Sequence, residues 1–273
     1  MLGIAGAAIA IYVGLIGILY FTQRNLMYHP AKAPGRPMDN GVQEMVAINL
    51  QNPDGQKIVS WYRAASTNKP TLIYFHGNAG HIGDRSAKVR AYLDQGFGVV
   101  LVGYRGYGDN PGSPTEEGLY ADANIALEFL ARSGTAPDHW VLYGESLGTG
   151  VAVEMAYRYA KTTPVAGVVL EAPFTSMVDA GKSHYPLVPV GLLIRDRYDS
   201  LSKIKQINAP LMIFHGTKDK IVPTKLGRQL FEAAIDPKTA HWIEGAGHND
   251  LYDHDGARLT IEFMKEIWSK HTS

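Results

Sequence analysis

The chain has 273 residues, of which 26 are basic and 26 are acidic. This length suits a single domain with a large core, and the balanced charge leaves no electrostatic footprint for a nucleic acid partner. The sequence contains no cysteine, which excludes a disulfide framework, a thiol nucleophile and a cysteine-based metal site.

The N-terminus is almost wholly apolar. Residues 2–21 carry no charge, and twenty helical residues span about 30 Å, the thickness of a bilayer core. We therefore predict a transmembrane anchor helix over residues 1–22, which makes this a single-pass membrane protein. Two alternatives remain. One is a cleaved signal peptide, but no basic residue precedes the apolar run and no clear cleavage site follows it. The other is a buried core helix, but such a helix would be amphipathic.

The flanks of this span predict its orientation and its contacts. Basic residues follow it at Arg24, Lys32 and Arg36, so the positive-inside rule places the rest of the chain in the cytoplasm. Gly6, Ala10 and Gly14 lie four residues apart, a spacing that supports pairing of two such helices into an oligomer.

Residues 23–41 contain five turn-forming prolines and glycines and are predicted to form a linker, which leaves residues 42–273 for the folded domain. Its opening pattern is a hairpin with strands over 46–50 and 57–64. Further strands are expected over 71–75, 98–102, 140–143, 166–170, 211–214 and 240–243, and helices over 85–95, 115–132, 149–156, 224–234 and 257–270. Alternating strands and helices predict an α/β fold, with a mostly parallel central sheet and helices on both faces.

The most informative motif is Gly144-Glu145-Ser146-Leu147-Gly148, which lies between a predicted buried strand and a predicted helix. In that context Gly-x-Ser-x-Gly forms a tight turn that lifts the serine hydroxyl above the edge of the sheet. The flanking glycines relieve the crowding of such a turn. Ser146 is therefore the predicted nucleophile.

A serine nucleophile needs a base and a group that orients the base. Asp219 and His248 each follow a later predicted strand, in the chain order Ser, Asp, His. Taken singly, Asp219 would be an ordinary turn carboxylate and His248 a solvated loop histidine. Together they predict a catalytic triad of Ser146, Asp219 and His248.

An oxyanion needs two N–H donors beside the nucleophile. We expect these from Leu147, at the start of the helix after Ser146, and from Asn78 in the glycine-rich segment after the strand over 71–75. No histidine or carboxylate cluster has the spacing of metal ligands, so we expect no metal site.

Residues 173–203 are longer than a simple crossover between two strands and contain an apolar run at 188–194. We predict a short cap over the site, with Leu192 and Leu193 binding substrate; one ordinary helix with a long loop is the alternative.

Several segments together resemble the α/β-hydrolase superfamily, and more closely its membrane-anchored Bem46-type branch, which is similar to the ABHD acyl-protein depalmitoylases. The segments that carry this resemblance lie at 23–30, 76–80, 103–108, 112–120, 144–148, 215–219 and 244–250. The resemblance implies a cofactor-independent serine hydrolase with the triad named above. The cysteine-rich, lipidated N-terminus of the mammalian depalmitoylases is replaced here by the apolar span.

These observations predict a membrane-anchored hydrolase that cleaves carboxylic esters or thioesters through an acyl-enzyme. Its expected substrates are small molecules or lipids with apolar acyl chains, with acylated proteins as a further class. Two other functions remain open. The same triad hydrolyses amides or peptides in other enzymes, and a membrane-tethered scaffold would need no activity.

Overall fold

The structure, a computed structural model, describes residues 2–32 and 34–271. Met1, Ala33 and residues 272–273, which fall in the predicted anchor, linker and domain, lie outside the described residues. The centre of the fold is an eight-stranded sheet with the order β10-β9-β8-β7-β4-β6-β3-β2. Its strands are β2 (Val46–Gln51), β3 (Lys57–Arg63), β4 (Thr71–Phe75), β6 (Gly98–Val102), β7 (Trp140–Glu145), β8 (Gly167–Glu171), β9 (Leu211–Gly216) and β10 (Lys238–Ile243).

The sheet is parallel from β10 to β6, and β3 runs in the opposite direction, so that it pairs antiparallel with both β6 and β2. The predicted hairpin is therefore confirmed as β2 and β3 at one edge of the sheet. All residues of β4, β6 and β8 are buried, as expected for strands that helices cover on both faces.

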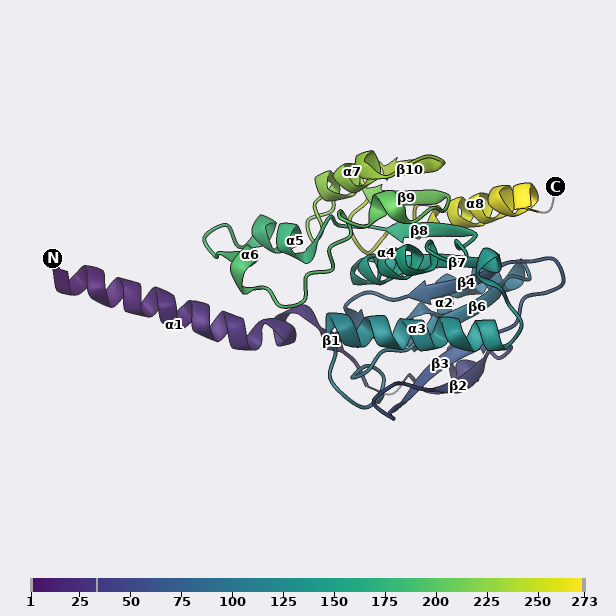
Figure 1. The fold of residues 1–273 in the computed structure, drawn as a ribbon, viewed down its shortest axis with the longest axis horizontal. Helices are drawn as coiled ribbons and strands as arrows, with labels where there is room; N and C mark the ends of the chain where they lie inside the picture. The colour runs from purple at the N-terminus through teal and green to yellow at the C-terminus, as the bar shows by residue number, and fades with distance from the viewer. Residues whose placement is uncertain (1, 33, 272–273) are drawn as a thin grey trace.

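Helices cover both faces of the sheet (Figure 1). One face packs against α2 (Ser86–Asp94) and α8 (Gly256–His271), and the other against α3 (Glu116–Arg132), α4 (Leu147–Tyr159) and α7 (Thr224–Ala233). Short 3₁₀ turns lie at Pro37–Asn40, Ile82–Arg85, Pro137–His139 and Ile204–Gln206. The predicted α/β-hydrolase architecture is confirmed.

The N-terminal helix α1 (Leu2–Met27) projects from one end of the domain (Figure 1). Its segment Ala5–Met27 is long and apolar enough to cross a membrane, and none of its most apolar stretch is buried in the fold. A core helix, one of the two alternatives, is thereby excluded.

The predicted end of α1 at residue 22 is wrong, because the helix continues to Met27. Gln23 and Arg24 resemble the polar end of a span, but both side chains bind the cap: the Gln23 amide donates to Leu193 O at 3.2 Å, and Arg24 pairs with Asp196 at 2.8 Å. The segment after it is also ordered rather than a plain linker, since β1 (His29–Pro30) pairs in parallel with β5 (Ala79–Gly80).

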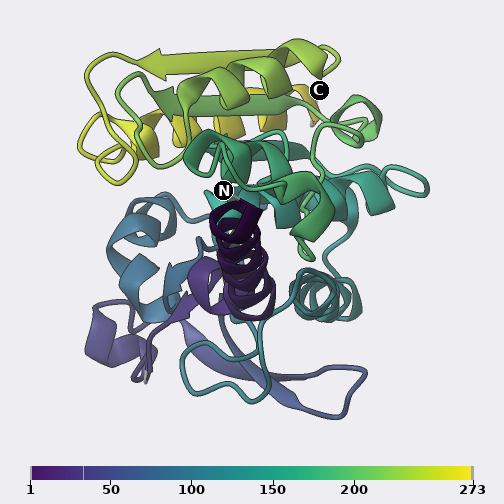
Figure 2. The ribbon, with the colours of Figure 1, turned by 90° about the vertical axis from the view of Figure 1, so that its left-hand side faces the viewer.

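The predicted cap contains two short helices, α5 (Met177–His184) and α6 (Val190–Leu193), between β8 and β9. Ser176 caps α5 by accepting a hydrogen bond from the Asp179 N–H. The cap lies beside α1 from Tyr12 toward its C-terminal end, and Figure 2, which views α1 nearly end-on, shows it next to that helix.

Candidate active site

Ser146 lies in the turn between β7 and α4, with φ of 50° and ψ of −114°. An L-residue adopts such a conformation only when its surroundings enforce it. A Cβ at position 148 would strike the carbonyl oxygen of Phe75, and one at position 144 would strike the backbone of Thr149. The two glycines are therefore what allows this turn to pack against the sheet, as a nucleophile elbow requires.

The three residues of the predicted triad lie together. His248 Nε2 is 2.9 Å from Ser146 Oγ, and His248 Nδ1 is 2.7 Å from Asp219 Oδ2. Ser146, Asp219 and His248 follow β7, β9 and β10, whose carboxyl ends meet at one edge of the parallel sheet. With a proton on Nδ1, the imidazole donates to Asp219 and its Nε2 accepts the serine proton.

Four hydrogen bonds hold the Asp219 carboxylate. Oδ1 accepts from the N–H groups of Ile221 and Val222, each at 2.8 Å, and Oδ2 lies 3.1 Å from His215 Nε2 as well as close to His248. Burial would raise the pKa of Asp219, but the hydrogen bonds from His215 and His248 outweigh it and hold the pKa well below the ordinary value. The carboxylate therefore stays ionised and keeps the imidazole in one orientation. The sequence analysis did not reveal this bond between His215 and Asp219.

The predicted oxyanion donors, Asn78 and Leu147, line the same cavity as Ser146. Leu147 opens α4, so its N–H precedes the first intrahelical hydrogen bond and stays free for a ligand. Asn78 is held from three sides: its side chain donates to Met27 O at 2.8 Å, and its own carbonyl accepts from His29 N–H at 2.8 Å and from Tyr107 Oη at 2.7 Å. The C-terminal end of α1 thus holds the segment that carries Asn78, a contact that the sequence did not reveal.

Two cavities of opposite character meet at Ser146. The first, of about 300 Å³, is apolar and lies between the oxyanion residues, the cap and the end of α1. Its lining includes Leu19, Leu26, Phe174, Met177, Val188, Val190, Leu193 and Ile194. The second, of about 200 Å³, is polar and is lined by Asp84, Arg85, Lys88, Glu145, Glu171, His248 and Asn249. His248 lines only the polar one of these two.

The two leucines predicted to bind substrate are placed differently. Leu193 lines the apolar cavity. Leu192 does not, because its side chain is 88 % exposed on the outer side of the cap. Adjacent residues of a helix point about 100° apart, so α6 presents only one of the two to the cavity.

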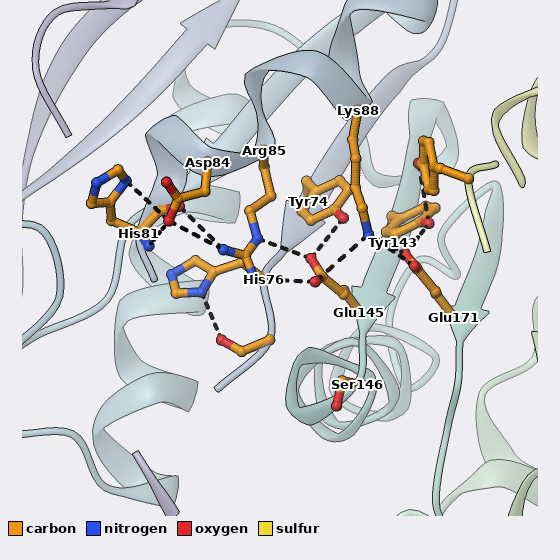
Figure 3. A network of polar contacts seen from close by, with 12 residues as sticks. Tyr74, His76, His81, Asp84, Arg85, Lys88, Tyr143, Glu145, Ser146 and Glu171 are labelled. Atoms are coloured by element: carbon orange, nitrogen blue, oxygen red, sulfur yellow. Dashed lines mark hydrogen bonds and ion pairs between the residues drawn. The ribbon is translucent and has the colours of Figure 1, made fainter. Parts of the chain in front are cut away.

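A buried ionic network lies beside Ser146 and includes Glu145, which directly precedes it (Figure 3). Arg85 donates to both oxygens of Glu145, at 3.0 and 3.1 Å, and Lys88 donates to Glu171 at 2.8 Å. Burial would raise the pKa of Glu145, but Arg85 and Lys88 outweigh it and hold the pKa below its ordinary value, whereas burial raises the pKa of Glu171. The network lines the polar cavity with paired charges. Its only signal in the sequence is the acidic residue inside the Gly-x-Ser-x-Gly motif.

His76, directly after β4, is buried two residues before Asn78, with the centre of its ring 4.3 Å from that of Tyr104. Burial and the nearby Arg85 lower its pKa to about 3, so the folded protein keeps this imidazole neutral where an unfolded chain, with an ordinary pKa of about 6.5, would bind a proton. Folding stability must therefore fall as the pH drops below about 6.5.

At pH 5.5 this linkage costs about 1.4 kcal/mol of stability. We expect the decrease in unfolding free energy between pH 7.5 and 5.5, measured with denaturant in detergent, to be smaller by about that amount in His76→Gln than in the wild type. His241, whose pKa burial also lowers, contributes equally to both proteins and cancels. Equal pH dependence in the two proteins would contradict a buried neutral His76.

Comparisons with known proteins place this chain in a family. A model of the alpha/beta hydrolase fold matches residues 70–189, and a model of the serine aminopeptidases, S33, matches residues 190–255. An uncharacterised protein of Mycobacterium tuberculosis is 35 % identical over 257 residues, which cover 93 % of this chain and 90 % of that protein. The human alpha/beta hydrolase domain-containing protein 17B is 35 % identical over 72 % of this chain and 67 % of its own length. The human protein ABHD12B is 38 % identical over 77 % of this chain and 64 % of its own.

Solved structures share the fold at low sequence identity. An esterase of Pyrococcus furiosus superposes with a TM-score of 0.68 and 19 % identity, over 89 % of this chain and 98 % of the esterase. A monoacylglycerol lipase of Paleococcus ferrophilus superposes with a TM-score of 0.61 and 20 % identity, over 77 % and 99 % of the two chains. The sheet order, the position of the Gly-x-Ser-x-Gly turn and these relatives agree: the chain belongs to the α/β-hydrolase family.

Proposed function

We propose that this protein is a membrane-anchored serine hydrolase that cleaves carboxylic esters or thioesters of apolar acyl groups. The observation that carries the proposal is the hydrogen-bonded series Asp219–His248–Ser146, which ends at the mouth of an apolar cavity. No cofactor is needed for this chemistry, because the nucleophile, base and oxyanion donors are all supplied by the chain.

The proposed reaction follows from these positions. His248 Nε2 takes the Ser146 proton as Oγ attacks the acyl carbon, and the N–H groups of Asn78 and Leu147 stabilise the oxyanion. His248 then protonates the leaving group, and an acyl-enzyme remains. Water activated by His248 releases the carboxylic acid and restores Ser146.

The two cavities suit different halves of the substrate. The leaving group must lie within reach of the histidine that protonates it, and His248 lines the polar cavity. The acyl chain then occupies the apolar cavity behind the oxyanion donors. A substrate with an apolar acyl chain and a polar leaving group fits both sides, as a lipid ester or an acylated protein does.

Amide hydrolysis is the second candidate, because the serine aminopeptidase model matches residues 190–255. Matched ester, thioester and amide substrates with one octanoyl group separate the candidates. We expect kcat/KM for the ester and thioester to exceed that for the amide by at least about 100-fold. Preference for the amide would replace the proposed esterase with an amidase.

Anchoring to a membrane is supported by the exposed apolar helix α1, and retention in the membrane pellet after alkaline carbonate washing is the expected result. Soluble mature protein beginning after Phe21 would indicate a signal peptide instead. The placement of the catalytic domain in the cytoplasm is part of the proposal and rests on the basic residues after the span.

Leu192 and Leu193 form a matched pair for testing the acyl cavity. Leu193→Ser is expected to lower kcat/KM for octanoate esters about 10-fold in detergent while acetate esters change little, since a lost buried leucine contact is worth about 1.5 kcal/mol or more. Leu192→Ser should leave both substrates nearly unchanged, because its side chain is outside the cavity. An equal loss for both chain lengths in Leu193→Ser would mean that this residue supports only the fold.

A further inference from the structure

The cap is bound along α1 rather than only at the end of the helix. Tyr12 Oη donates to Leu187 O at 2.8 Å, and Gln23 exchanges hydrogen bonds with Leu193 O, at 3.2 Å, and with the Arg195 N–H, at 2.8 Å. At 1.5 Å per residue, the stretch from Tyr12 to Arg24 spans about 18 Å of helix. The cap and α1 therefore share one orientation relative to any membrane that α1 enters.

One end of this contact is polar. Arg24 makes a bidentate pair with Asp196, at 2.8 and 2.9 Å, and Tyr28 donates to the same carboxylate at 3.1 Å. Arg195 and Arg197, on either side of Asp196, are exposed. Exposed arginines of this kind suit the level of lipid headgroups, whose phosphates they can bind.

The other end of the contact is apolar. Leu187 and Leu192 are 84 % and 88 % exposed, and Tyr185 is 50 % exposed. We call residues 185–192 the cap tip. The Leu187 carbonyl accepts a hydrogen bond from Tyr12. The cap tip therefore extends from the level of Arg24 toward the N-terminus of α1, the direction in which the apolar span runs.

The backbone of the cap tip is also suited to an apolar medium, where unpaired polar groups are costly. The N–H groups of Val188, Val190 and Leu192 donate to Tyr185, Val188 and Pro189 carbonyls, and Tyr12 satisfies the Leu187 carbonyl. The cap tip also contains Pro186 and Pro189, which have no N–H to satisfy.

We propose that the cap tip is immersed in the hydrocarbon of the membrane leaflet next to Arg24, and that the apolar cavity takes its acyl chain directly from that leaflet. The cavity is walled by Leu19 and Leu26 of α1 and by Tyr185 and Val188 of the cap, so it lies against the immersed surface. An acyl chain then reaches Ser146 without crossing water. The immersion of the cap tip does not depend on the proposed function, whereas the loading of acyl chains rests on the proposed function.

Immersion is tested by fluorescence quenching. The chain has no cysteine, so Leu187→Cys and Leu192→Cys each give a single thiol for an environment-sensitive dye in the full-length protein. Ile235→Cys is the control: Ile235 is 64 % exposed and follows the end of α7, outside the cap segment 173–203. The labelled proteins are reconstituted into phosphatidylcholine vesicles that contain lipids with a nitroxide at acyl carbon 5 or 12.

We expect blue-shifted emission from positions 187 and 192 and quenching several-fold stronger than at position 235. Quenching no stronger than at 235 would overturn the immersion.

The loading of acyl chains is tested with Leu187→Asp, which should lower turnover of a long-chain ester in vesicles about 10-fold but leave the turnover of a soluble butyrate ester in detergent unchanged. Equal turnover of both esters by variant and wild type would overturn loading from the leaflet. Quenching without hydrolysis of any ester would sustain the immersion and overturn the proposed function.

Discussion

Ser146→Ala is expected to reduce kcat for a p-nitrophenyl octanoate ester by about 10⁶-fold, the loss seen when a triad serine is removed. The reason is the absence of the attacking oxygen, since His248 Nε2, now 2.9 Å from Oγ, would have no hydroxyl to activate. Residual activity would come from the oxyanion donors and binding alone.

The substitution should leave the fold unchanged, because alanine is smaller than serine at the same strained turn. Thermal unfolding and circular dichroism of the variant provide the control. Turnover within about 10-fold of the wild type by a folded Ser146→Ala protein would remove the nucleophile from the proposal.

Asp219→Asn is expected to lower kcat about 10⁴-fold. An asparagine cannot stabilise the imidazolium, and its amide N–H₂ favours the wrong tautomer of His248, whose Nδ1 lies 2.7 Å from Oδ2. The loss should appear in kcat rather than in KM, since Asp219 does not line the apolar cavity.

Asp250→Asn is the matched control in the loop that carries His248. Asp250 accepts a hydrogen bond from the Gly247 N–H at 2.7 Å, whereas the hydrogen bonds of the imidazole go to Asp219 and Ser146. Its variant should retain kcat within about 10-fold, because a carboxamide oxygen still accepts that bond. Loss of activity in Asp250→Asn with normal kcat in Asp219→Asn would reassign the acid.

The arrangement of the sheet was predictable because each strand and helix carries its own local signal. Apolar runs such as Thr71–Phe75 and Gly98–Val102 predict buried parallel strands, and the order of strands and helices predicts the crossovers. The closeness of Ser146, Asp219 and His248 was predictable for a related reason: the carboxyl ends of parallel strands meet, so residues in the loops after β7, β9 and β10 come together.

The contacts of α1 were not predictable from local patterns. Gln23 and Arg24 are polar residues after an apolar span, which is typical of a helix end, and their partners lie about 170 residues later in the cap. Only the tertiary structure shows that Asp196 binds Arg24 and that Met27 O binds Asn78. The predicted linker boundary failed for this reason.

Both Leu192 and Leu193 were predicted to bind substrate, and Leu192 lies outside the apolar cavity for a different reason. Both lie in one apolar run, and α6 has four residues, too few for a hydrophobic period to indicate which face is inward. The packing of this helix against α1 and α5 sets its rotation. Val190 of α6 packs against Gly181 of α5. Such packing depends on residues far apart in the sequence.

The central claim, that Ser146 is an activated nucleophile, is tested most directly by covalent labelling. The full-length protein in detergent is treated with a fluorophosphonate probe, and the modified residue is located by mass spectrometry of its peptides. The account predicts one adduct at Ser146, none in Ser146→Ala, and much slower labelling in Asp219→Asn. An unlabelled wild-type protein, or an adduct at another serine while Ser146 stays unmodified, would contradict it.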